Sequence, residues 1–270
     1  MYCGAFLSSY RDREISIGTV IAVNGKGGTG KTTIAGLIIS ELIRRKKGSI
    51  LAIDADPNSC FAGSLGVKDP ATIVGICEEI SGHMDKIPSG VTKDRFIEMK
   101  VQESLTETKD FDLLVMGAPE GPGCYCYVNN LLREIIGRIT RGYDYTVIDN
   151  AAGMEHISRR TSGDISKLLV VSDYSIPGVR AAKKIYKLAK TLKTRIGGAY
   201  LILNRVSGSL SLLKDEISAT GMDMAGEVPY SAKLVEWNIS DKPIFALCDK
   251  AVTAAITGIF DKFTENLQCP

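Results

Sequence analysis

The sequence predicts an α/β fold with a mostly parallel central sheet and helices on both faces. Short apolar runs rich in β-branched residues alternate with segments of helical periodicity along the 270-residue chain. These runs are continuously apolar, which is typical of parallel strands covered on both faces. Glycine-rich and acidic segments directly follow several of the runs, and ligands of such sheets bind beyond the carboxyl ends of the strands. The sequence therefore places a binding site along that edge of the sheet.

The same periodicities predict the individual elements. Strands are expected at residues 20–24, 50–54, 112–116, 145–149, 168–172 and 199–204, with a short one near 225–228. Helices are expected at residues 31–46, 128–140, 178–192, 209–220 and 252–266. The segment 70–110 is less regular, and short helices are expected there, with a further strand near residues 101–105.

Composition and charge narrow the class of protein. Hydrophobic residues make up 44% of the chain, and no linker divides it, so a single domain is expected over residues 19–270 after an N-terminal extension at 1–18. The net charge of +2 gives no global field toward nucleic acid or anionic lipid, and neither is expected as a partner. Residues 1–18 lack the apolar core of a signal peptide, and no run reaches membrane-spanning length, which predicts a cytoplasmic protein.

A phosphate-binding loop follows the first expected strand. Its residues fit GxxxxGK[ST] and are Gly25, Lys26, Gly27, Gly28, Thr29, Gly30, Lys31, Thr32 and Thr33. Glycines let the backbone approach phosphate closely, and consecutive amides at a helix N-terminus form a nest for the anion. Lys31 would place its charge on the β- and γ-phosphates, and Thr32 would offer a hydroxyl to Mg²⁺. The loop therefore predicts a P-loop NTPase.

Lys26 makes this loop more informative, because a generic P-loop places no demand on that position. The run KGGTGKT resembles the deviant Walker A motif of the family that includes nitrogenase iron protein and the MinD and ParA ATPases. That resemblance implies a homodimer in which Lys26 reaches the partner's nucleotide. A cation at the γ-phosphate stabilises the charge that spreads in the transition state. Lys26 and Lys31 are therefore both predicted to be catalytic.

Two acidic segments follow strands, as the same resemblance requires. The segment IDADPN ends the second strand, and Asp56 would orient or deprotonate the attacking water, with Asp54 supporting Mg²⁺ or the loop geometry. Asp149 ends the apolar run YTVID in the manner of a Walker B strand and would hold a magnesium-bound water. Gly153 could supply an amide to the γ-phosphate, as in a switch that senses hydrolysis.

Base recognition is expected from a third region. Asn204 and Arg205 end the apolar run AYLILN, and in the family an asparagine there contacts adenine. Residues 226–245 resemble the family's stretch that contains a loop closing over the base. This resemblance adds Pro229 to the residues expected to bind the nucleotide. The guanine-reading NKxD pattern is absent because Ser207 stands where its aspartate would fall. ATP is therefore favoured over GTP.

Seven cysteines are scattered along the chain, and only Cys124 and Cys126 are close enough for joint chemistry. A nearby helix N-terminus would favour the thiolate, which is the metal-binding form. Two thiolates are too few for a closed tetrahedral site, but a two-fold axis would bring four together. Zn²⁺ or Ni²⁺ would then bridge two chains. Buried inert thiols, a redox switch and a bridging iron–sulfur cluster are the alternatives.

Together, the deviant P-loop, DADPN and GCYC before VNN resemble the CooC family, the nickel-insertion ATPases of carbon monoxide dehydrogenase, whose relatives serve acetyl-CoA synthase. The resemblance spans about residues 19–265. It implies an ATP-dependent dimeric metallochaperone with such a nickel enzyme as client. A positioning ATPase of the MinD or ParA type and an ATP-driven electron donor are the alternatives. Residues 251–270 hold few cations, which disfavours membrane targeting by a terminal helix.

Overall fold

The computed structural model describes residues 18–75, 88, 90–117, 134–152, 164–191, 195–240 and 242–265. Its strands are β1 Thr19–Gly25, β2 Ile50–Ala55, β3 Thr106–Glu107, β4 Asp112–Val115, β5 Tyr145–Asn150, β6 Lys167–Asp173, β7 Ala199–Val206 and β8 Asp223–Pro229. They form one sheet in the order β3-β4-β2-β5-β1-β6-β7-β8. Every neighbouring pair is parallel except β3 with β4. The predicted fold class is confirmed.

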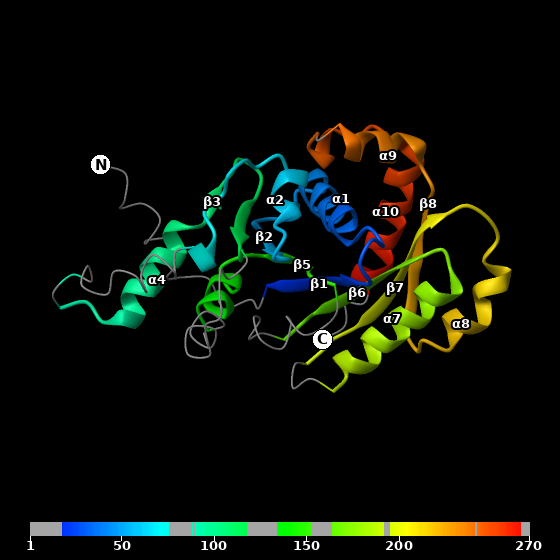
Figure 1. Cartoon of the computed structure of the whole chain (residues 1–270), viewed down its shortest axis with the longest axis horizontal. Coiled ribbons are helices and arrows are strands. Elements are labelled where there is room, and N and C mark those ends of the chain that lie inside the picture. Colours follow the sequence, from blue (N-terminus) through cyan, green and yellow to red (C-terminus); the bar gives the residue numbers. More distant parts are fainter. Residues whose placement is uncertain are drawn as a thin grey trace.

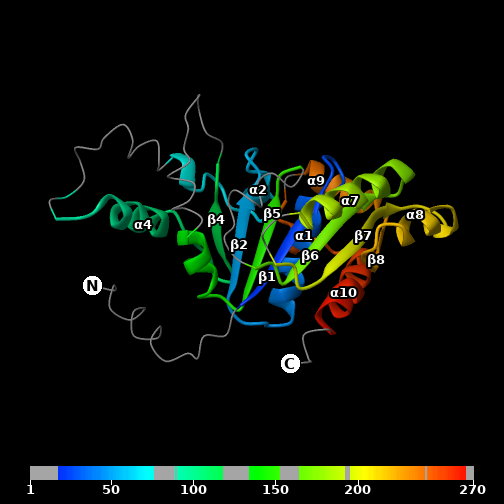
Figure 2. The same ribbon diagram turned by 90° about the horizontal axis from the view of Figure 1, so that it is seen from below.

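Helices cover both faces of this sheet (Figures 1 and 2). They are α1 Lys31–Arg44, α2 Cys60–Ser64, α4 Lys93–Glu103, α7 Ile176–Ala189, α8 Lys214–Ser218, α9 Ala232–Ile239 and α10 Lys250–Thr264, with 3-10 turns η2 Leu210–Leu213 and η3 Ile244–Ala246. Residues 134–140 are also helical. A parallel sheet sandwiched in this way leaves its carboxyl edge open for ligands.

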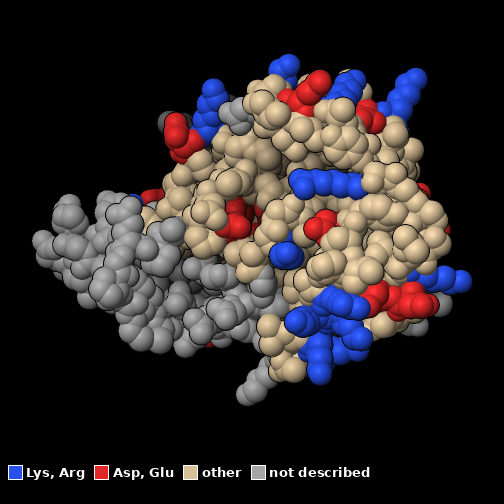
Figure 3. All heavy atoms as spheres, turned by 45° about the vertical axis from the view of Figure 1, so that its right-hand side comes forward, with Lys and Arg blue, Asp and Glu red and all other residues tan. Residues whose placement is uncertain are grey.

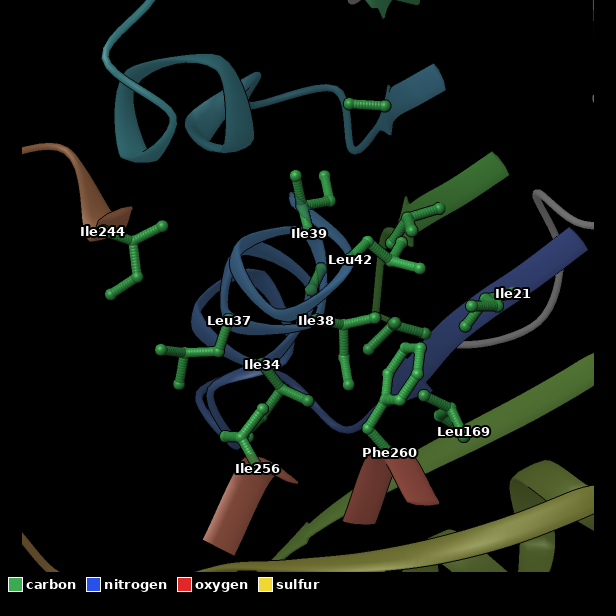
Figure 4. Packing of buried hydrophobic residues seen from close by; sticks show 14 of the residues in the cluster. Ile21, Ile34, Leu37, Ile38, Ile39, Leu42, Leu169, Ile244, Ile256 and Phe260 are labelled. Atoms are coloured by element: carbon green, nitrogen blue, oxygen red, sulfur yellow. The ribbon is translucent and has the colours of Figure 1, made fainter. Parts of the chain in front are cut away.

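The larger core lies on the face covered by α1, α2, α9 and α10. Helix α1 is apolar around most of its circumference, since Ile34, Ile38 and Leu42 are fully buried and Leu37 is nearly so. Such a helix must be covered on more than one side. Figure 4 shows how the sheet, α10 and η3 surround it. The helix that carries the phosphate loop is therefore held rigidly in the protein.

On the opposite face, α7 packs over β1, β6 and β7, while α4 and residues 134–140 pack over β2, β4 and β5. Helix α7 begins where the Ser175 hydroxyl accepts a hydrogen bond from the Gly178 amide at 3.0 Å. Its outer surface is basic, and Figure 3 shows Lys and Arg side chains gathered where α7 lies. No described helix is long and apolar enough to cross a membrane.

The strand predicted near residues 101–105 is wrong, because α4 occupies residues up to Glu103 and β3 follows it. Ile97 and Val101 lie four residues apart and are both buried, which is the spacing of one helical face. The helix predicted at residues 209–220 starts as the 3-10 turn η2 and continues as α8. Helices α2 and α9 were not predicted. The extension at 1–18 lies almost wholly outside the described residues.

Candidate nucleotide-binding site

The carboxyl ends of β1, β2, β5 and β7 bring the predicted polar residues to one edge of the sheet. Asp149 pairs in register with Val23 of β1 and with Asp54 of β2. Asn204 lies at the end of β7 and pairs with Asp173 of β6. Segments far apart in the sequence thus supply one continuous polar edge. Its buried polar residues, each at most 3% exposed, are Asn24, Asp54, Asp149, Asn150 and Asn204.

The phosphate loop is folded into a turn. The Thr29 amide and hydroxyl both donate to the Lys26 carbonyl, at 3.4 Å and 2.9 Å. Gly30 has φ 92°, and a Cβ there would lie 2.4 Å from the Asn204 Nδ2. Only glycine fits this position. Because Gly30 precedes α1 without a side-chain cap, the first amides of α1 are available to an anion.

The two lysines of the loop occupy different environments. Lys31 is only 7% exposed, and its ammonium lies 3.5 Å from the Lys26 carbonyl, inside the loop. The Lys26 side chain is exposed, and no ion pair involves it within the described residues. Lys31 is therefore placed to act on a nucleotide in its own loop, whereas Lys26 extends toward solvent.

Thr32, predicted to offer its hydroxyl to Mg²⁺, and Asp149, predicted to hold a magnesium-bound water, lie in direct contact. The Thr32 hydroxyl donates to Asp149 Oδ2 at 2.6 Å, while the buried Oδ1 has no hydrogen-bond partner in the described part of the chain. Burial raises the pKa of Asp149 to about 7, although the Thr32 hydrogen bond opposes the shift. The neighbouring charge of Asp54 adds to it. A buried carboxylate oxygen without a hydrogen-bond partner is suited to bind a cation or a cation-bound water.

Asp54 serves the geometry of the loop after β2. Its carboxylate accepts from the amides of Phe61 at 2.9 Å, Ala62 at 3.2 Å and Asp56 at 3.2 Å. Burial raises the pKa of Asp54 to about 6, and these amides oppose the rise. Of the two roles expected for Asp54, its contacts favour the support of this loop and of α2.

Asp56 lies half-buried at the start of the turn that follows β2. Its Oδ1 accepts from the amide and side chain of Asn58, at 2.9 Å and 2.8 Å. These contacts fix the carboxylate near the rim of the site. Its role toward a water stays a prediction.

Asn204 and Arg205 contact the phosphate loop directly. The Asn204 Nδ2 donates to the Thr29 carbonyl at 2.8 Å, and its Oδ1 accepts from the Arg205 amide at 2.9 Å. Arg205 adopts φ 60°, and its guanidinium donates to the Gly28 carbonyl at 3.2 Å. Both residues therefore brace the loop from β7, a role that the sequence did not predict.

A shallow pocket, open to solvent, adjoins the loop. It contains the predicted residues Asn204, Arg205 and Pro229, so the structure brings all three together. It also contains residues of α9 that sequence reasoning missed. The lining comprises Thr33, Asn204, Arg205, Pro229, Tyr230, Ser231, Leu234, Val235 and Asn238. The signal for α9 was present in Ser231, whose hydroxyl caps the helix by accepting from the Leu234 amide at 3.0 Å.

Three predicted site residues, Gly153, Cys124 and Cys126, lie outside the described residues. Within the described residues, no three His, Cys, Asp or Glu side chains come together in a way that could hold a metal ion. The metal that the cysteines were predicted to share therefore stays a proposal.

The family model for the CobQ/CobB/MinD/ParA nucleotide binding domain matches residues 20–244. The chain belongs to this family. Within it, the chain is 42% identical over 231 residues to an uncharacterized ATP-binding protein of Methanocaldococcus jannaschii, covering 84% of this chain and 91% of that protein. It is 25% identical over 225 residues to the carbon monoxide dehydrogenase accessory protein CooC of Rhodospirillum rubrum, covering 79% and 84%.

Solved structures of the CobQ/CobB/MinD/ParA type share the fold. The cell division ATPase MinD of Pyrococcus furiosus matches with a TM-score of 0.65 at 20% identity, covering 92% of this chain and 99% of that chain. The MinD of Pyrococcus horikoshii, solved in complex with Mg-ADP, matches with a TM-score of 0.60 at 21% identity, covering 93% and 96%.

As a member of this family, the chain is a P-loop ATPase, and ATP with Mg²⁺ are its expected ligands. The residues present fit the metal ion. Thr32 offers a hydroxyl oxygen, and Asp149 offers a buried oxygen without a partner among the described residues. Oxygen donors of this kind are those that Mg²⁺ prefers beside phosphates. When bound, the ion would neutralise phosphate charge.

Proposed function

We propose that this chain is an ATP-driven metallochaperone of the CooC type, which delivers nickel to carbon monoxide dehydrogenase or acetyl-CoA synthase. The observation that carries the proposal is the pair of Cys124 and Cys126. The pair occurs in a chain that is similar to CooC over 79% of the length of this chain. In this role the chain would act as a homodimer, with Zn²⁺ or Ni²⁺ as cargo.

The topology supports a link between the cysteines and the nucleotide. The segment that contains them follows β4, which pairs in parallel with β2. Val115 of β4 lies opposite Asp54, and the Met116 amide donates to the Asp54 carbonyl at 2.9 Å. The chain therefore leaves β4 toward the cysteines at the edge where Asp54 and Asp149 lie. Residues 116 and 117, which lead into the segment with the cysteines, would therefore lie at the same edge as the nucleotide.

The active site of the proposed dimer draws on two chains. Lys31 would hold the β- and γ-phosphates, and the exposed Lys26 of the other chain would stabilise charge at the γ-phosphate. Water attacks the γ-phosphorus, the bond to the β–γ bridging oxygen breaks, and Asp56 accepts the proton that the water loses. Gly153 would contact the γ-phosphate and so respond to its departure.

The same two-fold axis would create the metal site. Four thiolates, two from each chain, suit Zn²⁺ in a tetrahedron or Ni²⁺ in a square arrangement. Because ATP binds to one dimer geometry better than to another, hydrolysis would shift the dimer and release the metal to the client.

Metal content of the anaerobically purified protein tests this function. We expect one metal ion per dimer in the wild type, and loss of that ion in Cys124→Ser or Cys126→Ser, with ATP hydrolysis retained. Cys60→Ser and Cys248→Ser are matched controls, since both thiols are exposed and lie elsewhere in the described chain. Metal content that is insensitive to Cys124 and Cys126 overturns the proposal. A brown, iron-containing protein would indicate an electron donor instead.

A further inference from the structure

Helix α9 presents one face to the pocket beside the phosphate loop. Leu234, Val235 and Asn238 line the pocket and follow Ser231 at helical spacing. Thr33, which follows Thr32 at the start of α1, lines the same pocket. The pocket therefore extends from the phosphate end of the site to α9. A nucleotide held in the loop would direct its sugar and base along this path.

Most polar side chains of the pocket are already committed. Both ends of the Asn204 carboxamide are occupied by the Thr29 carbonyl and the Arg205 amide. The Arg205 guanidinium bonds the Gly28 carbonyl, and the Ser231 hydroxyl bonds Asp249 at 2.5 Å. These two bonds fix the orientation of Asn204, the residue expected to contact adenine, and leave it one N–H and one lone pair for a base.

Asn238 differs from these residues. Its side chain is exposed and makes no hydrogen bond within the described residues. Among the pocket residues that the structure describes, it is therefore the one whose carboxamide is neither oriented nor occupied by another contact. Tyr230, 56% exposed, and Val235, 40% exposed, flank the same hollow and can cover the faces of a flat ring.

We propose that Asn238 is the specificity-determining residue for the base, and that its carboxamide pairs with the N6–N7 edge of adenine. Adenine presents one donor and one acceptor there, which match an asparagine amide. Guanine presents two acceptors at O6 and N7, which leave the Asn238 oxygen without a donor. This inference rests on the ATP-driven function proposed above and assigns the part of the substrate that the chain reads.

Equilibrium binding of ATP, GTP and 7-deaza-ATP, measured in the presence of Mg²⁺ with hydrolysis blocked by Asp56→Asn, tests the assignment. The protein with Asn238 should bind ATP with about five- to hundredfold higher affinity than GTP. The same difference is expected against 7-deaza-ATP, which lacks the N7 acceptor. Asn238→Ala should lower the affinity for ATP to that for 7-deaza-ATP and leave the affinity for GTP unchanged. Glu236→Ala is the control, because this exposed residue lies on α9 outside the pocket.

The outcomes separate this inference from the metallochaperone proposal, since binding of nucleotide alone involves neither cysteine. If Asn238→Ala weakens ATP and GTP equally, or if 7-deaza-ATP binds the chain with Asn238 as well as ATP does, the base assignment is overturned while ATP hydrolysis stands. A preference for ATP that survives Asn238→Ala also overturns it and returns the role to Asn204.

Discussion

The Thr32 hydroxyl donates a hydrogen bond to Asp149 Oδ2 at 2.6 Å, joining the start of α1 to the end of β5 across 117 residues of sequence. The second oxygen of Asp149 is buried and has no partner in the described part of the chain. The pair thus links the phosphate loop to the strand that precedes the predicted switch at Gly153. A magnesium ion at this point would be sensed by both segments.

Removing the hydroxyl of Thr32 should uncouple catalysis from Mg²⁺. We expect Thr32→Ala to lower ATP hydrolysis by about a hundredfold or more, because both the oxygen ligand and the bond to Asp149 are lost. Thr32→Ser keeps the hydroxyl and should retain most activity. A titration of hydrolysis rate against Mg²⁺ checks this. An alanine variant with wild-type Mg²⁺ dependence would show that Thr32 holds no metal.

The buried carboxyls should make the ligand-free protein less stable as pH rises. Burial raises the folded-state pKa of Asp149 to about 7 and of Asp54 to about 6, from 3.8. The folded state therefore holds protons that the unfolded state releases between about pH 4 and 7, and stability is lost across that window. Each such proton changes the unfolding free energy by about 1.4 kcal/mol per pH unit.

Asp149→Asn isolates one of these protons. The asparagine can still accept from Thr32 but carries no charge, so we expect a shallower fall in unfolding free energy between pH 5.5 and 7.5. Urea unfolding at both pH values, in the presence of a chelator, gives the change in unfolding free energy between them. Magnesium-dependent hydrolysis should be lost in the same variant. A slope identical to that of the wild type contradicts the assigned pKa.

Asp54 should matter for stability more than Asp56 does. Asp54→Ala leaves the buried amides of Phe61 and Ala62 without their acceptor, and we expect the unfolding free energy to fall by about 3 kcal/mol. Asp56→Ala removes only contacts to exposed Asn58 and should cost less than about 1 kcal/mol while abolishing hydrolysis. Denaturant unfolding of both variants measures the two losses in unfolding free energy. Equal losses would mean that Asp54 is not the residue that holds this loop.

Gly30 should tolerate no side chain. Gly30→Ala introduces a Cβ 2.4 Å from Asn204 Nδ2 at φ 92°, so we expect nucleotide affinity to drop at least about tenfold as the loop is displaced. Gly63→Ala is the matched control in helix α2, where a Cβ meets nothing within 4 Å. That change should leave binding intact and stabilise the helix slightly. Normal ATP binding by Gly30→Ala would contradict the tight contact.

Local patterns predicted much of the fold and site because their information lies in adjacent residues. The loop from Gly25 to Thr33 and the strand end at Asp149 are contiguous motifs, and the structure brings them together. The segment 101–105 misled the prediction because Val101 and Leu105 suggested a short strand, whereas Val101 lies with Ile97 on one buried helical face. The capping hydroxyl of Thr92, which accepts from the Arg95 amide at 3.4 Å, favours the helix.

Contacts between distant segments could not be predicted in this way. Asn204 reaches the Thr29 carbonyl over 175 residues, and no local spacing encodes that approach. The raised pKa of Asp149 depends on burial by neighbouring strands, which is a property of the assembled sheet. The role of α9 was missed because only its residue Leu234 is buried, so its apolar periodicity is weak.

Mixing two inactive variants tests most directly whether two chains build one active site. Lys26→Ala should bind ATP but lack the cation for its partner, whereas Lys31→Ala should fail to hold nucleotide but still present Lys26. Each variant alone should hydrolyse ATP slowly. In an equimolar mixture, we expect activity to reappear, because Lys26 of one chain completes the loop of the other. A mixture as inactive as its components, in which mixed dimers are demonstrated, would contradict the two-chain site.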